Sequence, residues 1–295
     1  MSSEKLLGNL FLSIGAMKAG TTWLYAVLAR HPELHFAMEK EIHYFYHRYV
    51  NDAQLSDKRR MHEARNRYLL RFDPDKAHVD NIRTNLRWVA AYLDRPVDDF
   101  WYRNLFQLRR QETYACDFSN LNALLPGEVW PRISDRCDKL RVLYTMRDPV
   151  KRLWSHTKFH LQVSNQLGNL EKWGPNEFRK FLKQAHIWQN AEYGAVLRKL
   201  RSGLSPEQYK VIFYEDLHAD QRGTLRGIEE FLDIAPFHYP EGVLTKRFTE
   251  SVKHPMPDFF PGLIAEDVDR IRMEVQAEGF ALPASWSVPA TNSAL

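Results

Sequence analysis

Residues 10–24 read Leu-Phe-Leu-Ser-Ile-Gly-Ala-Met-Lys-Ala-Gly-Thr-Thr-Trp-Leu. The apolar run 10–14 predicts a buried strand. Gly15 ends this strand, and Gly20 closes a short loop before a helix that begins at Thr21. A strand, a glycine loop and a helix N-terminus form an anion site, because backbone N–H groups and the helix dipole point at the bound group. The stretch therefore predicts an α/β fold with a phosphate cradle after its first strand.

The position of the lysine separates this cradle from the common nucleotide-binding loop. In the Walker pattern a lysine follows the second glycine and stands beside a Ser or Thr that holds magnesium. Here Lys18 precedes Gly20, and Thr21 and Thr22 supply hydroxyl donors in the first helical turn. The loop is thus predicted to bind phosphate with a lysine, hydroxyls and backbone N–H groups, without a metal-binding site.

A second segment has the same strand-to-helix character. Residues 141–159 read Arg-Val-Leu-Tyr-Thr-Met-Arg-Asp-Pro-Val-Lys-Arg-Leu-Trp-Ser-His-Thr-Lys-Phe. The run 141–146 is strand-like, Arg147 stands at its end, and Pro149 suits the first turn of a helix. A guanidinium at a strand end and a hydroxyl further along the helix, that of Ser155, can converge on one phosphate.

The two segments resemble motifs of the sulfotransferases that use 3′-phosphoadenosine 5′-phosphosulfate (PAPS). The first is similar to the family's 5′-phosphosulfate loop, and the second to its 3′-phosphate motif, where an Arg and a Ser are separated by seven residues. Weaker similarity, nearest to the bacterial and heparan-sulfate-type enzymes, extends over residues 8–280. The resemblance implies PAPS as sulfuryl donor, 3′-phosphoadenosine 5′-phosphate (PAP) as product, and no metal. The implied cofactor-binding residues are Gly15, Lys18, Ala19, Gly20, Thr21, Thr22, Trp23, Arg147, Ser155 and Lys253.

Strands and helices alternate along the chain. The predicted strands are 10–14, 35–37, 113–117, 141–146 and 209–214. This alternation indicates a P-loop-like parallel sheet flanked by helices on both faces, in a single domain over 1–295. Two stretches, 46–110 and 157–190, are rich in aromatic and basic residues and lack buried-strand patterns. Both leave from carboxyl ends of strands, where open α/β sheets bind ligands, so they are candidate acceptor-binding insertions.

Residues 40–45, Lys-Glu-Ile-His-Tyr-Phe, hold the predicted acid–base groups. In the heparan-sulfate-type enzymes that this segment resembles, a Glu at the position of Glu41 takes the acceptor proton, which implies Glu41 as general base. If the segment is extended, His43 points to the same side, as a helper or as the base itself. Lys18 is expected to stabilise the leaving phosphate. The alternative role for Glu41 is a surface ion pair, for example with Lys40.

Two further segments bear on the family resemblance, one by departing from it and one by matching it loosely. Heparan-sulfate-type enzymes carry a second catalytic lysine where this chain has Phe118, within Cys-Asp-Phe-Ser-Asn at 116–120. This departure favours the broader bacterial group, although Asp117 and Ser119 are still expected near the pocket. Residues 251–257 look like a bacterial version of the loop that closes over the nucleotide. The basic candidates in and before this loop are Lys246, Arg247 and Lys253.

Composition limits the functional classes. The 295 residues include 41 Lys and Arg against 37 Asp and Glu, a net charge of +4 that suits a small polyanionic cofactor and requires no nucleic acid. No run approaches the roughly 20 apolar residues of a membrane span. The first residues lack a secretory pattern, and Cys116 and Cys137 form no disulfide framework, so a cytoplasmic protein is expected. The basic cluster at 58–60, together with Arg65, Arg67 and Arg71, is expected on one solvated helical region; the alternative is a role in binding an acidic acceptor.

Two other functions stay open at this point. A P-loop kinase-like phosphotransferase would use the acid-ended apolar runs 142–148 or 211–216, and dependence on ATP and magnesium would identify it. A non-catalytic nucleotide- or glycan-binding module would keep the fold without turnover of PAPS. For a transferase, the acceptor stays open between a small molecule, a lipid, a glycan and a peptide tyrosine. The sequence also defines no oligomeric state.

Overall fold

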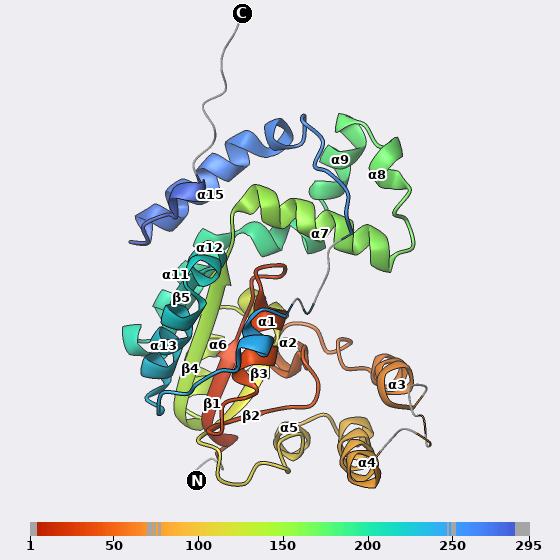
Figure 1. Cartoon of the computed structure of the whole chain (residues 1–295), viewed down its shortest axis with the longest axis vertical. Coiled ribbons are helices and arrows are strands. Elements are labelled where there is room, and N and C mark those ends of the chain that lie inside the picture. The colour runs from red at the N-terminus through yellow and green to blue at the C-terminus, as the bar shows by residue number, and fades with distance from the viewer. Residues whose placement is uncertain are drawn as a thin grey trace, which may run out of the picture.

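A parallel sheet forms the centre of the fold in the computed structural model, which describes residues 5–69, 73, 75, 78–246, 248 and 252–286. Its strands are β1 (Leu7–Ser13), β2 (Leu34–Phe36), β3 (Tyr114–Phe118), β4 (Cys137–Met146) and β5 (Tyr209–Phe213). Within the described residues the strand order is β2-β3-β1-β4-β5, and every neighbouring pair is parallel (Figure 1). All the predicted strands are present, with β4 beginning earlier than expected, at Cys137.

Helices and short turns connect the strands. The first connection is α1 (Thr21–Leu28). Between β2 and β3 come α2 (Tyr44–Tyr49), α3 (Asp57–Ala64), the π-helix η1 (Arg65–Leu69), α4 (Val79–Leu93) and α5 (Asp99–Asn104). Between β3 and β4 lie η2 (Asn120–Leu124) and α6 (Val129–Ser134). Between β4 and β5 come α7 (Pro149–Val163), α8 (Asn169–Lys172), α9 (Pro175–Leu182), α10 (Ala185–Trp188), η3 (Gln189–Ala191), α11 (Tyr193–Gly203) and η4 (Pro206–Gln208). After β5 follow α12 (Tyr214–Ala219), α13 (Gln221–Leu232), α14 (Glu241–Leu244), η5 (Pro261–Ile264), α15 (Ala265–Ala277) and η6 (Ala284–Trp286).

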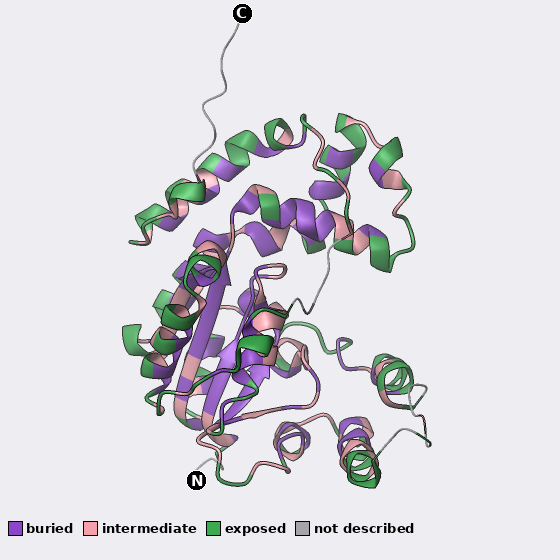
Figure 2. Cartoon of the chain, viewed as in Figure 1, coloured by how far each residue is buried: buried purple, intermediate pink, exposed green. Residues whose placement is uncertain are grey.

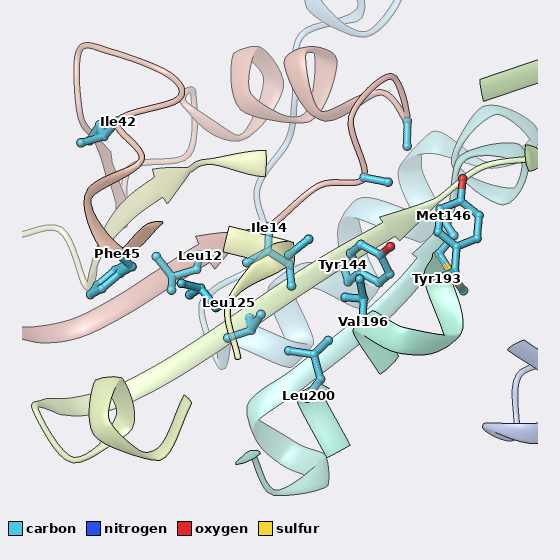
Figure 3. Packing of buried hydrophobic residues seen from close by; sticks show 14 of the residues in the cluster. Leu12, Ile14, Ile42, Phe45, Leu125, Tyr144, Met146, Tyr193, Val196 and Leu200 are labelled. Carbon is cyan, nitrogen blue, oxygen red and sulfur yellow. The ribbon is translucent and has the colours of Figure 1, made fainter. Parts of the chain in front are cut away.

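The side chains of β1 explain why both faces of the sheet are covered. Leu12 lies in the larger apolar cluster, whereas Phe11 lies in a second cluster with residues of α1 and α13. Successive strand side chains point to opposite faces, so a strand that is apolar at consecutive positions is stable only when both faces are buried. Figure 3 shows the larger cluster, where Tyr144 of β4 lies above Val196 of α11, with Leu200 one turn further along. The expected α/β sheet with helices on both faces is confirmed.

Burial follows the same arrangement. The strands are mostly buried, whereas the outer sides of α3, α4 and α15 are exposed (Figure 2). Along the described parts of the chain, no helix combines the length and the apolar character that a membrane span needs.

The insertion between β2 and β3 is held together by a buried arginine. Arg60 is 1% exposed and donates hydrogen bonds to the carbonyl oxygens of Leu55 (3.1 Å), Tyr92 (2.7 Å) and Asp94 (2.7 Å). It also forms an ion pair with Asp57 (2.7 Å). The expectation that the basic cluster 58–60 is solvated is therefore wrong for Arg60, because its donors satisfy backbone carbonyls at the end of α4.

We expect Arg60→Met to lower the free energy of unfolding by about 2–4 kcal/mol, because several carbonyls and the Asp57 carboxylate lose their partner. Denaturant unfolding followed by circular dichroism measures this change. Arg59→Met is the matched control, because the neighbouring Arg59 is exposed and donates a side-chain hydrogen bond to Gln54 (2.9 Å), not to the backbone carbonyls that Arg60 binds. Its change should stay within about 0.5 kcal/mol. Equal stability of the two variants would contradict the role given to Arg60.

Candidate active site

One cavity of about 840 Å³ lies where the connections leave the carboxyl ends of the strands. Segments that follow every strand of the sheet contribute to its wall. After β1 these are Met17, Lys18, Gly20, Thr21, Thr22 and Tyr25, and after β2 they are Met38, Glu39, Lys40, Glu41 and Arg67. Asn120 follows β3, and Arg147, Lys151, Trp154, Ser155, Lys158 and Phe159 follow β4. Tyr214 and Met256 follow β5. This is the location expected for a ligand in an open α/β sheet.

The glycine loop after β1 depends on left-handed backbone. Gly15, Lys18 and Gly20 have φ angles of 116°, 68° and 84°. A Cβ atom on Gly20 would lie 2.9 Å from Cδ2 of Tyr214, so this position requires glycine for both its φ and its close packing. The Lys18 carbonyl accepts a hydrogen bond from Nη1 of Arg147 (3.0 Å). The two phosphate motifs predicted from the sequence are therefore in direct contact.

Positive charge is concentrated around this loop. The Lys18 ammonium lies 4.5 Å from the centroid of the Phe159 ring. Burial lowers the pKa of Lys18 below its usual value. Three neighbouring cations lower the pKa further, namely Arg147, Lys40 and Lys158. Such a group of like charges is stabilised when an anion enters between them.

Arg147 and Ser155 border the same cavity, which is what binding one anion together would require. Arg147 follows β4, its guanidinium carbon lies 4.3 Å from the Tyr214 ring centroid, and its carbonyl accepts from the Tyr193 hydroxyl (2.8 Å). Its Nε is buried and has no hydrogen-bond partner among the described residues, which fits an anion such as a phosphate. Ser155 lies on α7, which begins at Pro149 as expected, and it faces the same cavity.

The extended path considered for residues 40–45 is wrong. Glu41 and His43 have φ angles of 67° and 61°, so the chain turns at both and the alternation of an extended strand does not apply. Glu41 lines the cavity, pairs with the Lys40 ammonium, and accepts a hydrogen bond from the Asn120 N–H (2.7 Å). His43 lies outside the cavity wall, with its Nε2 3.8 Å from Oε2 of Glu41.

The charges around Glu41 and His43 determine their ionisation. Burial acts to raise the pKa of Glu41, but the charge of Lys40 and hydrogen bonds from Lys40 and the Asn120 N–H outweigh it and hold this pKa below its usual value; His43 adds to this effect only when it is protonated. Burial lowers the pKa of His43 to about 4. At neutral pH Glu41 is therefore ionised and His43 is neutral.

A buried network supports this turn from behind. The Ser119 hydroxyl accepts a hydrogen bond from the His43 N–H (2.9 Å) and donates one to Oδ1 of Asp117 (2.6 Å). The Tyr102 hydroxyl donates to Oδ2 of Asp117 (2.9 Å). Burial raises the pKa of Asp117 to about 6. Asp117 and Ser119 therefore lie close to the site, as expected, but behind the wall of the cavity; Phe118 between them packs in the second apolar cluster.

Other predicted cofactor residues lie around the cavity and not on its wall. Trp23 donates to the Leu244 carbonyl (3.0 Å) and packs against the second apolar cluster. Gly15 and Ala19 shape the loop from within the fold. Lys246 and Lys253 are also absent from the wall, and Arg247 is outside the described residues. The predicted closing loop does reach the site, because Met256 lines the cavity and the Val252 carbonyl accepts from Lys158 (2.9 Å).

Several residues of the cavity wall were not predicted from the sequence as site residues, among them Glu39, Lys158 and Tyr214. Lys158 had a readable signal, because it stands three residues after Ser155 and hence on the same face of α7. Over the described ranges, no group of three or more His, Cys, Asp or Glu side chains is placed to hold a metal ion.

Comparisons with known proteins agree with this geometry. The model of the sulfotransferase family matches residues 11–238, and the chain belongs to this family. Carbohydrate sulfotransferase 15 of Rattus norvegicus is 24% identical over 272 residues, covering 83% of this chain and 47% of that protein. Its counterpart in Mus musculus is 25% identical over 281 residues, with the same shares of 83% and 47%. The chain thus spans about half the length of the curated relatives it matches.

Solved structures show the same fold. A sulfotransferase from Alicyclobacillus acidocaldarius superposes with a TM-score of 0.63 at 19% identity, covering 94% of this chain and 97% of its own. The sulfotransferase domain of the Synechococcus PCC 7002 olefin synthase gives a TM-score of 0.50 at 16% identity, with 95% and 98% covered. The predicted sulfotransferase fold and family are confirmed, and the kinase-like alternative is not supported.

We expect Gly20→Ala to lower the free energy of unfolding by about 1–3 kcal/mol, because a side chain at this φ is strained and would press on the Tyr214 ring. Denaturant unfolding measures the change. Gly168→Ala is the matched control, since Gly168 has a φ of −60° and nothing lies within 4 Å of its added Cβ. Equal effects at the two glycines would contradict the packing described for the loop.

Proposed function

We propose that this chain transfers a sulfuryl group from PAPS to an acceptor hydroxyl or amine and releases PAP. The observation that carries the proposal is that Lys18, Arg147 and Ser155, from two separate motifs, border one cavity. The Lys18 loop and the Arg147–Ser155 pair can each hold one phosphate group. A nucleotide with phosphates at its 5′ and 3′ positions matches these two anion sites.

The residues around the cavity suit an in-line displacement. The acceptor atom forms a bond to sulfur while the bond from sulfur to the bridging oxygen of the 5′-phosphate breaks. Lys18 would stabilise the charge that this phosphate gains, and the hydroxyls of Thr21 and Thr22 would hold its other oxygens. Glu41 would accept the acceptor proton, since it borders the cavity as a carboxylate. His43, placed behind Glu41, would position it.

A carbohydrate is the acceptor class that we propose, in preference to a lipid or another small molecule. The support is that both curated relatives carry the name carbohydrate sulfotransferase 15. The two candidate acceptor insertions each contribute to the cavity, the first through Arg67 and the second through Lys158 and Phe159. We therefore propose that residues 46–110 and 157–190 bind the acceptor.

The nucleotide preference tests the cofactor. PAP should bind more tightly than AMP, and Arg147→Ala or Ser155→Ala should remove most of this preference by deleting hydrogen bonds to the 3′-phosphate. A charge-assisted bond of this kind corresponds to about 10-fold or more in affinity. Isothermal titration calorimetry with both nucleotides measures the effect, and AMP binding by each variant is the control. Equal affinity of the wild-type protein for AMP and PAP would contradict the proposal.

A pair of variants tests the base. Glu41→Gln keeps the shape of the side chain and removes its basicity, so turnover of PAPS with a carbohydrate acceptor should fall about 100-fold or more while PAP affinity holds. His43→Ala should cost less if His43 only positions Glu41. A near-normal rate in Glu41→Gln with collapse in His43→Ala would transfer the role to His43. Wild-type protein that binds PAP but never turns over PAPS would indicate a non-catalytic module.

A further inference from the structure

Lys40 lies beside the candidate base Glu41 and on the wall of the cavity that Lys18 also borders. It borders the same cavity as Lys18 and Glu41, and its side chain is 18% exposed. Its ammonium pairs with Oε1 of Glu41. Its charge also lies near enough to Lys18 to contribute to the lowered pKa of that lysine. Lys40 is thus close both to Glu41, the proposed base, and to Lys18, which is proposed to stabilise the leaving phosphate.

The pairing with Lys40 restrains Glu41 as a base. A carboxylate bound to an ammonium holds its charge strongly and accepts a proton reluctantly. The other oxygen of Glu41 is bound by the Asn120 N–H, which is fixed in the backbone after β3. Lys40 is the partner able to move, because its charge is at the end of a flexible four-carbon chain.

We propose that Lys40 is a further catalytic residue, whose ammonium leaves Glu41 and binds the sulfuryl oxygens when PAPS enters the cavity. This inference rests on the function proposed above. Lys18 would then stabilise the negative charge on the leaving phosphate. Lys40 would stabilise the negative charge on the sulfuryl oxygens, which persists throughout the displacement. Release from Lys40 makes Glu41 a stronger base only when the sulfuryl group is present. The acceptor proton then moves to Glu41 as the new bond to sulfur forms.

Binding of PAP and PAPS, without acceptor, tests this assignment. PAP lacks the sulfuryl group. Lys40→Gln should therefore lower the affinity for PAPS about 10-fold and change the affinity for PAP by no more than about 2-fold. Lys151→Gln is the matched control, because it removes the same charge from the α7 side of the cavity. It should change both affinities by one common factor. Calorimetric titrations of the wild type and both variants supply the ratios. A common factor for the two nucleotides in Lys40→Gln would overturn the proposal.

A second variant gives an effect of opposite sign. Glu41→Gln frees Lys40 from its ion pair, so PAPS should bind about 3-fold or more tightly while PAP is unchanged, and the gain should vanish in the double variant with Lys40→Gln. If the Lys40→Gln variant does not fold, the PAPS affinity of Glu41→Gln alone tests the proposal. Unchanged PAPS affinity in Glu41→Gln would overturn the proposal that Lys40 leaves Glu41 to bind the sulfuryl group. Wild-type protein that binds neither nucleotide would contradict the proposed function instead.

Discussion

The concentration of positive charge at the carboxyl end of the sheet is the constraint on which the site depends. Lys18, Arg147 and Lys158 face one cavity, and each is held there by the fold: a turn, a strand end and a helix face. The like charges repel one another, and the arrangement persists because hydrogen bonds and a ring contact hold the Lys18 backbone and the charged side chains in place. An anionic ligand relieves this repulsion, so the fold selects for a polyanion before any particular contact forms.

Local backbone rules are broken where the chemistry is expected. Lys18, Glu41 and His43 all have positive φ angles, which residues other than glycine adopt only at a cost in free energy. The cost is offset by hydrogen bonds from distant parts of the chain: Arg147 on the cavity wall binds the Lys18 carbonyl, and Ser119, supported by Asp117 behind the wall, binds the His43 N–H. These contacts pre-organise the wall of the cavity. Strain at a site that tertiary contacts over-determine is typical of functional positions.

Sequence patterns predicted the sheet and the strand-to-helix junctions that carry both proposed phosphate motifs, because these features depend on local signals. An apolar run, a glycine pair and a proline at a helix start are visible in single segments. The geometry of Glu41 and His43 was not predictable in this way, since it depends on Ser119 and Asp117, far along the chain. The burial of Arg60 was not predictable for the same reason, because two of its carbonyl partners come from the end of α4. Which cations of the closing loop reach a ligand stays a prediction.

The proposed donor and acceptor sites lie on different parts of the fold. The proposed donor site uses loops directly attached to β1 and β4, whose positions follow from the sheet itself. The proposed acceptor site includes Arg67 of η1, which borders the cavity and forms an ion pair with Glu39, the residue before Lys40. That ion pair joins an insertion to the segment that carries the candidate base. A change in the insertion can therefore alter the acceptor pocket and the position of the base together, while the sheet keeps the nucleotide loops in place.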